Sequence, residues 1–140
     1  MSETGIQFGI FGMALVRAAE AMLRSLGGSE IRLLLPRSQP GDDPGAQLGL
    51  VDPGVEEVRL SPVVVRNLPT ASTGPRRRLE FLIPAAALSE ELSSRNVASA
   101  EDFFAGVMGV VYDSDLFHIE GFTSEYFGGM AYLYRLVGVE

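Results

Sequence analysis

Apolar residues near the start of the chain recur every three or four positions, which is the period of an amphipathic helix. The pattern covers residues 6–26 and ends at Gly27 and Gly28, which can adopt the left-handed backbone that ends a helix. We expect the apolar face of this helix to pack on a sheet or to be covered in part by another subunit. Its members are Phe8, Phe11, Leu15, Ala18, Met22 and Leu26.

Strand-like runs follow this helix. "SEIRLLLP" predicts a short strand, and "LEFLIP" predicts another. Between them, the valine-rich run "VEEVRLSPVVVRNLP" is interrupted by Pro62, which cannot donate a ladder hydrogen bond. This run therefore predicts an edge strand, a bulge or two short strands.

Two loops rich in proline and glycine separate these runs, at residues 36–54 and 67–78. Both are longer than a compact domain usually needs, and such loops often serve binding or assembly.

A short middle helix is predicted from its ends. Ser99 with Asp102 fits a capping box, and Gly106 follows the apolar turn at Phe103 and Phe104. This helix interrupts the strands, within a longer region of helical and turn character.

The chain closes with a predicted meander of three strands over residues 107–139. "DSD" turns the first strand into "LFHIEGF", and "TSEYFGG" turns that strand into "MAYLYRLVGV". No alternation of strand and helix indicates a parallel sheet. We predict one α+β domain over residues 1–140, a small, mainly antiparallel β barrel or sandwich with an N-terminal amphipathic helix and the short middle helix.

The composition is that of a folded protein, with 46% hydrophobic residues and no cysteine. The absence of cysteine removes disulfides, thiolate metal sites and thiol nucleophiles. The apolar start is interrupted by Arg17 and Glu20 before it is long enough to cross a bilayer. We therefore expect no membrane segment and a cytoplasmic protein.

Charge is distributed unevenly along the chain. Up to Ser89 there are 9 arginines and 9 acidic residues, and from Glu90 onward there are 2 and 9, which accounts for the net charge of −7. An acidic C-terminal part of this kind repels polyanions, so we expect no sequence-specific nucleic-acid binding.

The sequence offers little catalytic chemistry. His118 and Glu120 alternate onto one strand face, shared with Leu116 and Phe122, and could pair. No nucleophile motif or metal-binding motif accompanies them, so we interpret His118 as a half-exposed strand residue. The "DSD" triplet predicts a turn rather than a cation site, because too few oxygen ligands accompany it. We expect no enzyme activity, no cofactor and no metal.

Two further groups of side chains favour interfaces. Arg76, Arg77 and Arg78 form either a solvated loop or salt-bridge partners for the acidic C-terminal part, and such pairs between copies could set the register of a ring. The last strand is apolar on both faces, which predicts that a second molecule covers one of them. Aromatic residues crowd the same hairpin at Tyr126, Phe127, Tyr132 and Tyr134.

Three segments carry a resemblance to a known class of protein. They are "AEAMLRSLGGSEIRLLLPR", "LEFLIPAAAL" and "VVYDSDLFHIEGFTSEYFGGMAYLYRLVGVE". In order and pattern the chain resembles the neck proteins of tailed bacteriophages and prophages, which join head and tail, close the head or complete the tail. The resemblance implies a non-enzymatic structural protein, in the virion or the bacterial cytoplasm, that forms rings with itself and docks on a portal or tail protein.

The resemblance also implies a role for the acidic part, as a channel wall from which DNA is repelled. A second hypothesis remains open: a cytoplasmic β-domain that binds a small ligand between the N-terminal helix and the C-terminal hairpin. The residues predicted to lie at an interface are Phe8, Phe11, Arg76, Arg77, Arg78, Tyr126, Phe127, Tyr132 and Tyr134.

Overall fold

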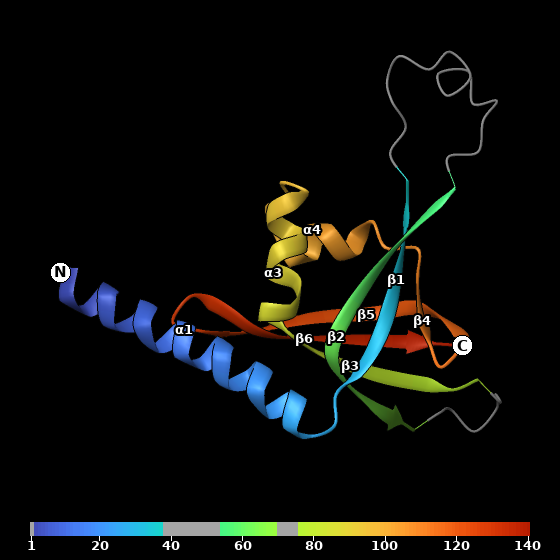
Figure 1. Ribbon diagram of the computed structural model, residues 1–140, viewed down its shortest axis with the longest axis horizontal. Helices are drawn as coiled ribbons and strands as arrows, with labels where there is room; N and C mark the ends of the chain where they lie inside the picture. The colour runs from blue at the N-terminus through green and yellow to red at the C-terminus, as the bar shows by residue number, and fades with distance from the viewer. Residues whose placement is uncertain (1, 38–53, 70–75) are drawn as a thin grey trace, which may run out of the picture.

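In the part of the chain that the structure describes, the fold is a closed barrel of six antiparallel strands with one long helix and two short ones (Figure 1). The computed structural model describes residues 2–37, 54–69 and 76–140, and the side chains of the first helix from Gly12 onward. The strands follow the order β1-β2-β3-β6-β5-β4 around the barrel. The prediction of a small antiparallel barrel with an N-terminal helix and a short middle helix is confirmed.

The elements run in the order α1 (Ser2–Ser25), β1 (Ser29–Pro36), β2 (Val55–Leu68), β3 (Arg78–Pro84), α3 (Ala85–Ser94), α4 (Ala100–Ala105), β4 (Gly109–Tyr112), β5 (Asp115–Phe127) and β6 (Met130–Val139).

Pro62 lies at a bulge inside one long strand. Val63 pairs with Ser29 and Leu60 pairs with Ile31, so β2 has one more residue than β1 at this point. The bulge lets β2 pair with β1 through its first half and with β3 through its second half. Of the three possibilities that the sequence left open, the bulge is correct, and the strand is not at an edge.

The barrel interior follows the two-residue period of its strands. In β1 the buried residues are Ile31, Leu33 and Leu35, each separated by a more exposed neighbour. Phe81 and Phe117 meet at the centre edge to face, with ring centroids 5.9 Å apart. A Cβ at Gly138 would lie 3.0 Å from Phe117 Cβ, so glycine at this position lets the two rings pack without crowding.

Two helices, rather than one, separate β3 from β4. Ser99 caps α4 by accepting a hydrogen bond from the Asp102 amide, and Gly106 ends the helix, as predicted. The additional helix α3 begins directly after Pro84. Both helices bury side chains in the barrel core, namely Leu88 in α3 and Phe103 and Phe104 in α4.

The C-terminal meander is confirmed, with one correction to its last turn. The predicted turn "TSEYFGG" is too long, because β5 continues to Phe127 and only Gly128 and Gly129 form the turn. Both glycines have positive φ, which a two-residue hairpin of this twist requires. The first turn is made by Asp113 and Ser114, also at positive φ.

The predicted loops lie largely outside the described residues. Of residues 36–54, the structure places Pro36 at the end of β1, and the Arg37 amide donates to the Gly54 carbonyl at 3.3 Å. Of residues 67–78, β2 continues to Leu68 and β3 begins at Arg78.

Candidate interaction surfaces

Helix α1 packs on the body of the protein through small and aliphatic residues. Gly12, Ala19 and Leu23 are its buried residues, spaced for one side of the helix. A Cβ on Gly12 would lie 3.3 Å from Met130 Cβ, so this glycine lets the helix approach the β5–β6 hairpin closely. The helix contacts β6, α3, β2 and β3, and its N-terminal half extends beyond the barrel (Figure 1).

The apolar face predicted for this helix is not the face that packs on the sheet. Met22 is 59% exposed and Leu26 is 66% exposed, whereas the adjacent Leu23 is buried. Successive helix residues are about 100° apart, so the packed face lies beside the predicted one. The apolar spacing of the sequence did not indicate the packed face, because glycine and alanine at two of the packed positions contribute little to a hydrophobic pattern.

We call four residues the apolar stripe: the half-buried Leu15, the exposed Ala18 and Met22, and the exposed Leu26, which directly follows α1. Phe127, 44% exposed at the hairpin end, adjoins it, since Phe127, Ala14, Leu15 and Ala18 line a common hollow. Phe8 and Phe11 lie in α1 with the same spacing, but their side chains are outside the described residues. Exposed apolar residues contiguous over a helix and a hairpin are typical of a contact surface.

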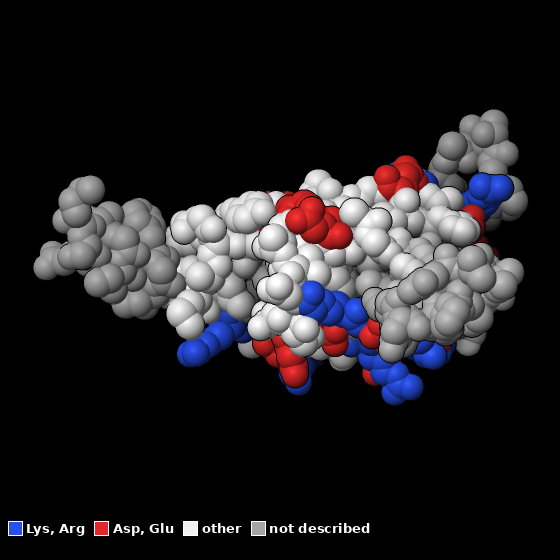
Figure 2. Space-filling view, turned by 90° about the horizontal axis from the view of Figure 1, so that it is seen from above, with Lys and Arg blue, Asp and Glu red and all other residues white. Residues whose placement is uncertain are grey.

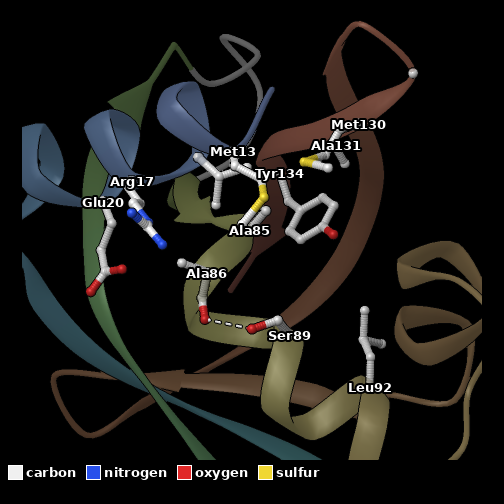
Figure 3. A pocket seen from close by; sticks show the side chains of 12 residues that line it. Met13, Arg17, Glu20, Ala85, Ala86, Ser89, Leu92, Met130, Ala131 and Tyr134 are labelled. Atoms are coloured by element: carbon white, nitrogen blue, oxygen red, sulfur yellow. Dashed lines mark hydrogen bonds between the residues drawn. The ribbon is translucent and has the colours of Figure 1, made fainter. Parts of the chain in front are cut away.

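On the opposite flank of α1 lies a groove of about 600 Å³ between α1, α3 and the start of β6 (Figure 3). Figure 3 shows Met13 and Tyr134 on either side of Ala85. Small side chains make up much of its wall, and Arg17 and Glu20 reach it from α1. Its lining residues are Met13, Val16, Arg17, Glu20, Ala85, Ala86, Ser89, Leu92, Gly129, Met130, Ala131 and Tyr134.

Tyr134 is a wall of this groove rather than an exposed interface residue. It is only 5% exposed, and its ring packs at a tilt against Phe122 and edge to face against Phe104, at centroid distances of 5.7 and 6.4 Å. Burial, followed by the charge of Glu101, raises the pKa of the Tyr134 hydroxyl above its usual value. Tyr132 is half-buried, and Tyr126 at the hairpin end is 58% exposed.

The arginine cluster is largely occupied within the chain. Arg77 forms an ion pair with Asp115 and another with Glu140 at 2.7 Å. Both bonds raise the pKa of Arg77, and the bond to Glu140 contributes most. Arg78 forms two bonds to Glu120, at 2.9 and 3.1 Å.

Arg76, which is exposed as Arg77 is, has no salt-bridge partner within the part of the chain that the structure describes. The predicted pairing with the acidic C-terminal part is therefore present, but within one chain.

A ladder of alternating charges crosses the outside of the barrel. Arg66 on β2 pairs with Glu80 on β3, and Glu80 also accepts from Arg135 on β6 at 3.5 Å. Arg135 in turn donates to Glu125 on β5 at 3.0 Å. Val137 lies opposite Glu80 in the sheet, so ion-paired side chains flank this outward valine. The outward residues of β6 are half-buried, and the cover of this face by a second molecule stays a prediction.

These ion pairs neutralise much of the acidic charge that the sequence shows in the C-terminal part. Asp115, Glu120 and Glu125, three acidic residues of the C-terminal part, are each bound to an arginine. Figure 2 shows acidic and basic side chains next to one another along one edge of the barrel. Much of the acidity of the C-terminal part is therefore balanced by arginines, two of them from earlier in the chain.

The pairing that was possible between His118 and Glu120 is not seen. His118 is exposed on β5, and Glu120 bonds Arg78 instead of the imidazole. The predicted face is also wrong for Phe122, because Glu120 is an extra residue between the pairs Ile119–Gly138 and Gly121–Val137. This bulge turns Phe122 toward the aromatic cluster of Phe104.

Among residues 2–37, 54–69 and 76–140, no group of three histidine or acidic side chains is arranged to hold a metal ion. Within the same residues, no helix is long and apolar enough to cross a membrane.

The sequence predicted the approximate positions of the groove and the apolar stripe, but not all of the elements that form them. The sequence hypothesis of a pocket between the N-terminal helix and the last hairpin named the right two elements but missed α3, whose Ala85 and Ala86 form one wall. The chain matches no protein-family model, no curated protein and no solved structure. Function is therefore inferred from these two surfaces and from the sequence resemblance.

Proposed function

We propose that this chain is a non-enzymatic structural subunit of a tailed-phage or prophage particle, which assembles into a ring where head and tail join. In this role it binds copies of itself and a portal or tail protein, without a cofactor. The residues that serve it lie on α1 and at the tip of the β5–β6 hairpin.

The observation that carries this proposal is the apolar stripe. A helix on the surface of a single domain normally turns its apolar residues toward that domain. Here the barrel packs against the helix face that carries Gly12, Ala19 and Leu23. It leaves the side chains of Met22 and Leu26 more than half exposed. Leaving several large apolar side chains in water is unfavourable by roughly 25 cal/mol for each Å², so a partner that covers them gains that free energy.

The segments that carry the resemblance also have the expected secondary structure. They form α1 with β1, β3 with the start of α3, and the β4–β6 meander. Their order on one closed barrel is compatible with a small ring subunit, and this supports the proposal.

Self-association is tested by native mass spectrometry and sedimentation over a range of protein concentrations. We expect oligomers that grow with concentration, and rings in electron micrographs. A Met22→Glu chain should remain monomeric, whereas Ala21→Glu, which places the same charge on an exposed position beside the stripe, should assemble as the parent does. A parent chain that stays monomeric at every concentration would overturn the ring proposal.

The phage assignment has its own test. Genes for capsid and tail proteins should flank the gene of this chain, and the chain should be found in purified particles. Neighbouring genes unrelated to particles would remove this assignment and leave self-association intact.

A second function is favoured by the groove. Its volume of about 600 Å³ is in the range of ligand pockets, and Tyr134 presents a polar group in an apolar wall. A small-ligand-binding domain would be a monomer that carries a small molecule through purification. Native mass spectrometry distinguishes the two functions in one measurement.

A further inference from the structure

We infer that the groove between α1, α3 and β6 receives the apolar stripe of a second copy of this chain. This inference rests on the proposed self-association and names both surfaces of the contact. One copy donates Leu15, Met22 and Leu26, and the next copy accepts them beside its Met13 and Tyr134.

The first argument is the placement of the two surfaces. With about 100° between successive helix residues, Met22 and Leu26 lie on one flank of α1, and Met13 and Glu20 lie on the other. The structure agrees, since Met13 and Glu20 line the groove and Met22 and Leu26 do not. A copy can therefore donate its stripe and accept a neighbour's stripe at the same time.

The second argument is the spacing of the stripe. Phe8, Phe11, Leu15, Ala18 and Met22 alternate steps of three and four residues, which average 3.5. This is the period of a helix that inserts its side chains between those of other helices. The groove offers such a setting, because two of its three walls are the helices α1 and α3.

The third argument is the chemistry of the groove wall. Ala85, Ala86, Gly129 and Ala131 are small, so the backbone of an incoming helix can approach closely. The stripe itself carries no charge, and its entry would bury no unpaired ion of its own. Arg17 and Glu20 belong to α1 at the side of the groove, where they can stay in contact with water (Figure 3).

The size of the surfaces favours a ring over a pair. A helix of 24 residues is roughly 36 Å long and about 10 Å wide, so one flank presents on the order of 400 Å². This is about half of what one partner contributes to a standard stable interface. Since the donating and accepting surfaces differ, each copy in a closed ring makes two contacts, whereas an isolated pair makes one.

The test uses two matched substitutions on the same helix. Met13→Glu places a charge in the groove and leaves the stripe intact, and Met22→Glu places the same charge in the stripe and leaves the groove intact. The two methionines are similarly exposed, at 52% and 59%, so neither change should unfold the domain. We expect each variant alone to lose self-association, with a dissociation constant raised about tenfold or more.

The decisive result comes from mixing the two variants. The intact stripe of the Met13→Glu chain should enter the intact groove of the Met22→Glu chain, which gives a heterodimer that cannot grow further. Native mass spectrometry with isotope-labelled chains detects it. Ser89→Trp, which fills the groove from an exposed position on α3, should behave as Met13→Glu does and controls for effects on α1 itself.

The other outcomes are distinct. If Met13→Glu and Ser89→Trp assemble as the parent does, the groove is not the acceptor and stripes pair with each other, which overturns the inference but not the proposed function. If the groove variants instead lose a bound small molecule, the groove is a ligand pocket and the inference is wrong. If the parent chain itself is monomeric, the proposed function fails first.

Discussion

The barrel and helix α1 differ in how fully their apolar side chains are buried and their charged side chains are paired. In the barrel, inward residues such as Phe81 and Phe117 are fully buried, and outward charges such as Glu80 are bound to arginines of the same chain. In α1, Leu23 is buried while Met22, the residue before it, is 59% exposed. The barrel satisfies most of its side chains within one chain, although Met108 and Leu116 are exposed, and the helix leaves more of its apolar surface without a cover.

This difference indicates where the protein acts. A closed barrel has no free strand edge, so it offers no ready place for another chain to add a strand. Its outer charges are also largely paired, which lowers their capacity to attract a partner. The least satisfied part is the helix with the adjoining tip of the hairpin, where five of the eight exposed large apolar residues of the described chain lie, and there we expect partners to bind.

The largest expected effect on stability comes from a substitution in the barrel interior. Phe81→Ala removes a ring that is 0% exposed and contacts Phe117 and Tyr112 edge to face, at 5.9 and 6.1 Å. We expect the free energy of unfolding in urea to fall by about 3–5 kcal/mol, from lost burial and the cavity that remains. Phe127→Ala is the matched control at a residue 44% exposed, and should cost less than about 1 kcal/mol in the dilute monomer. Equal losses would contradict the distinction between the two regions.

A pair of adjacent residues gives a sharper test in α1 itself. Leu23→Ala should lower the free energy of unfolding by about 2–3 kcal/mol, because Leu23 is buried where the helix packs. Met22→Ala should change it by less than about 0.5 kcal/mol in dilute solution.

The same pair separates folding from assembly. A protein that self-associates becomes more stable as its concentration rises. Thermal unfolding of the parent should therefore shift with concentration, and Met22→Ala should reduce this shift although it leaves the dilute protein unchanged. A parent with no concentration dependence, or a Met22→Ala chain as unstable as Leu23→Ala, would remove the contrast.

How far the sequence could predict the fold depends on the element. The strands β1 and β6 were predicted, but the inward face of β6 was not, because both of its faces are apolar; the structure buries Tyr134 and Leu136 and leaves their neighbours half-buried. The cap at Ser99 and the stop at Gly106 were predicted because their chemistry is local. The bulge at Glu120 was not, since no proline marks the extra residue in β5 as Pro62 marks the one in β2.

The candidate surfaces were harder to predict than the fold. Apolar periodicity identified the stripe that ends at Met22 and Leu26, but it could not tell that small residues on the next face, Gly12 and Ala19, contact the barrel instead. The ion pairs of Arg77 and Arg78 join residues far apart in sequence, so charge counting could not separate pairing within a chain from pairing between chains.

The smallest predicted effect lies where the two regions meet. Glu101, in the first turn of α4, accepts hydrogen bonds from Ser124 at 2.8 Å and from Tyr126 at 3.3 Å, both on β5 near the hairpin tip. The Ser124 bond is the main cause that lowers the pKa of Glu101 below its usual value of 4.5. Because the folded pKa lies below the unfolded one, the charged carboxylate stabilises the fold above pH 4.5, and this contribution is lost as the pH falls through the folded pKa.

Glu101→Gln should therefore be less stable than the parent at pH 7 by only a few tenths of a kcal/mol, since the carboxylate is exposed and well screened. The difference should shrink as the pH falls below 4.5, because the parent then loses the same charge. Urea unfolding of both chains at a series of pH values measures it, and contributions of other acidic groups cancel in the difference. Ser124→Ala should reproduce part of the loss, and a double-mutant cycle with Glu101→Gln isolates their bond. A difference that stays constant down to pH 3 would show that this charged hydrogen bond does not hold the hairpin tip to α4, and the tip would then belong with the unsatisfied region rather than with the barrel.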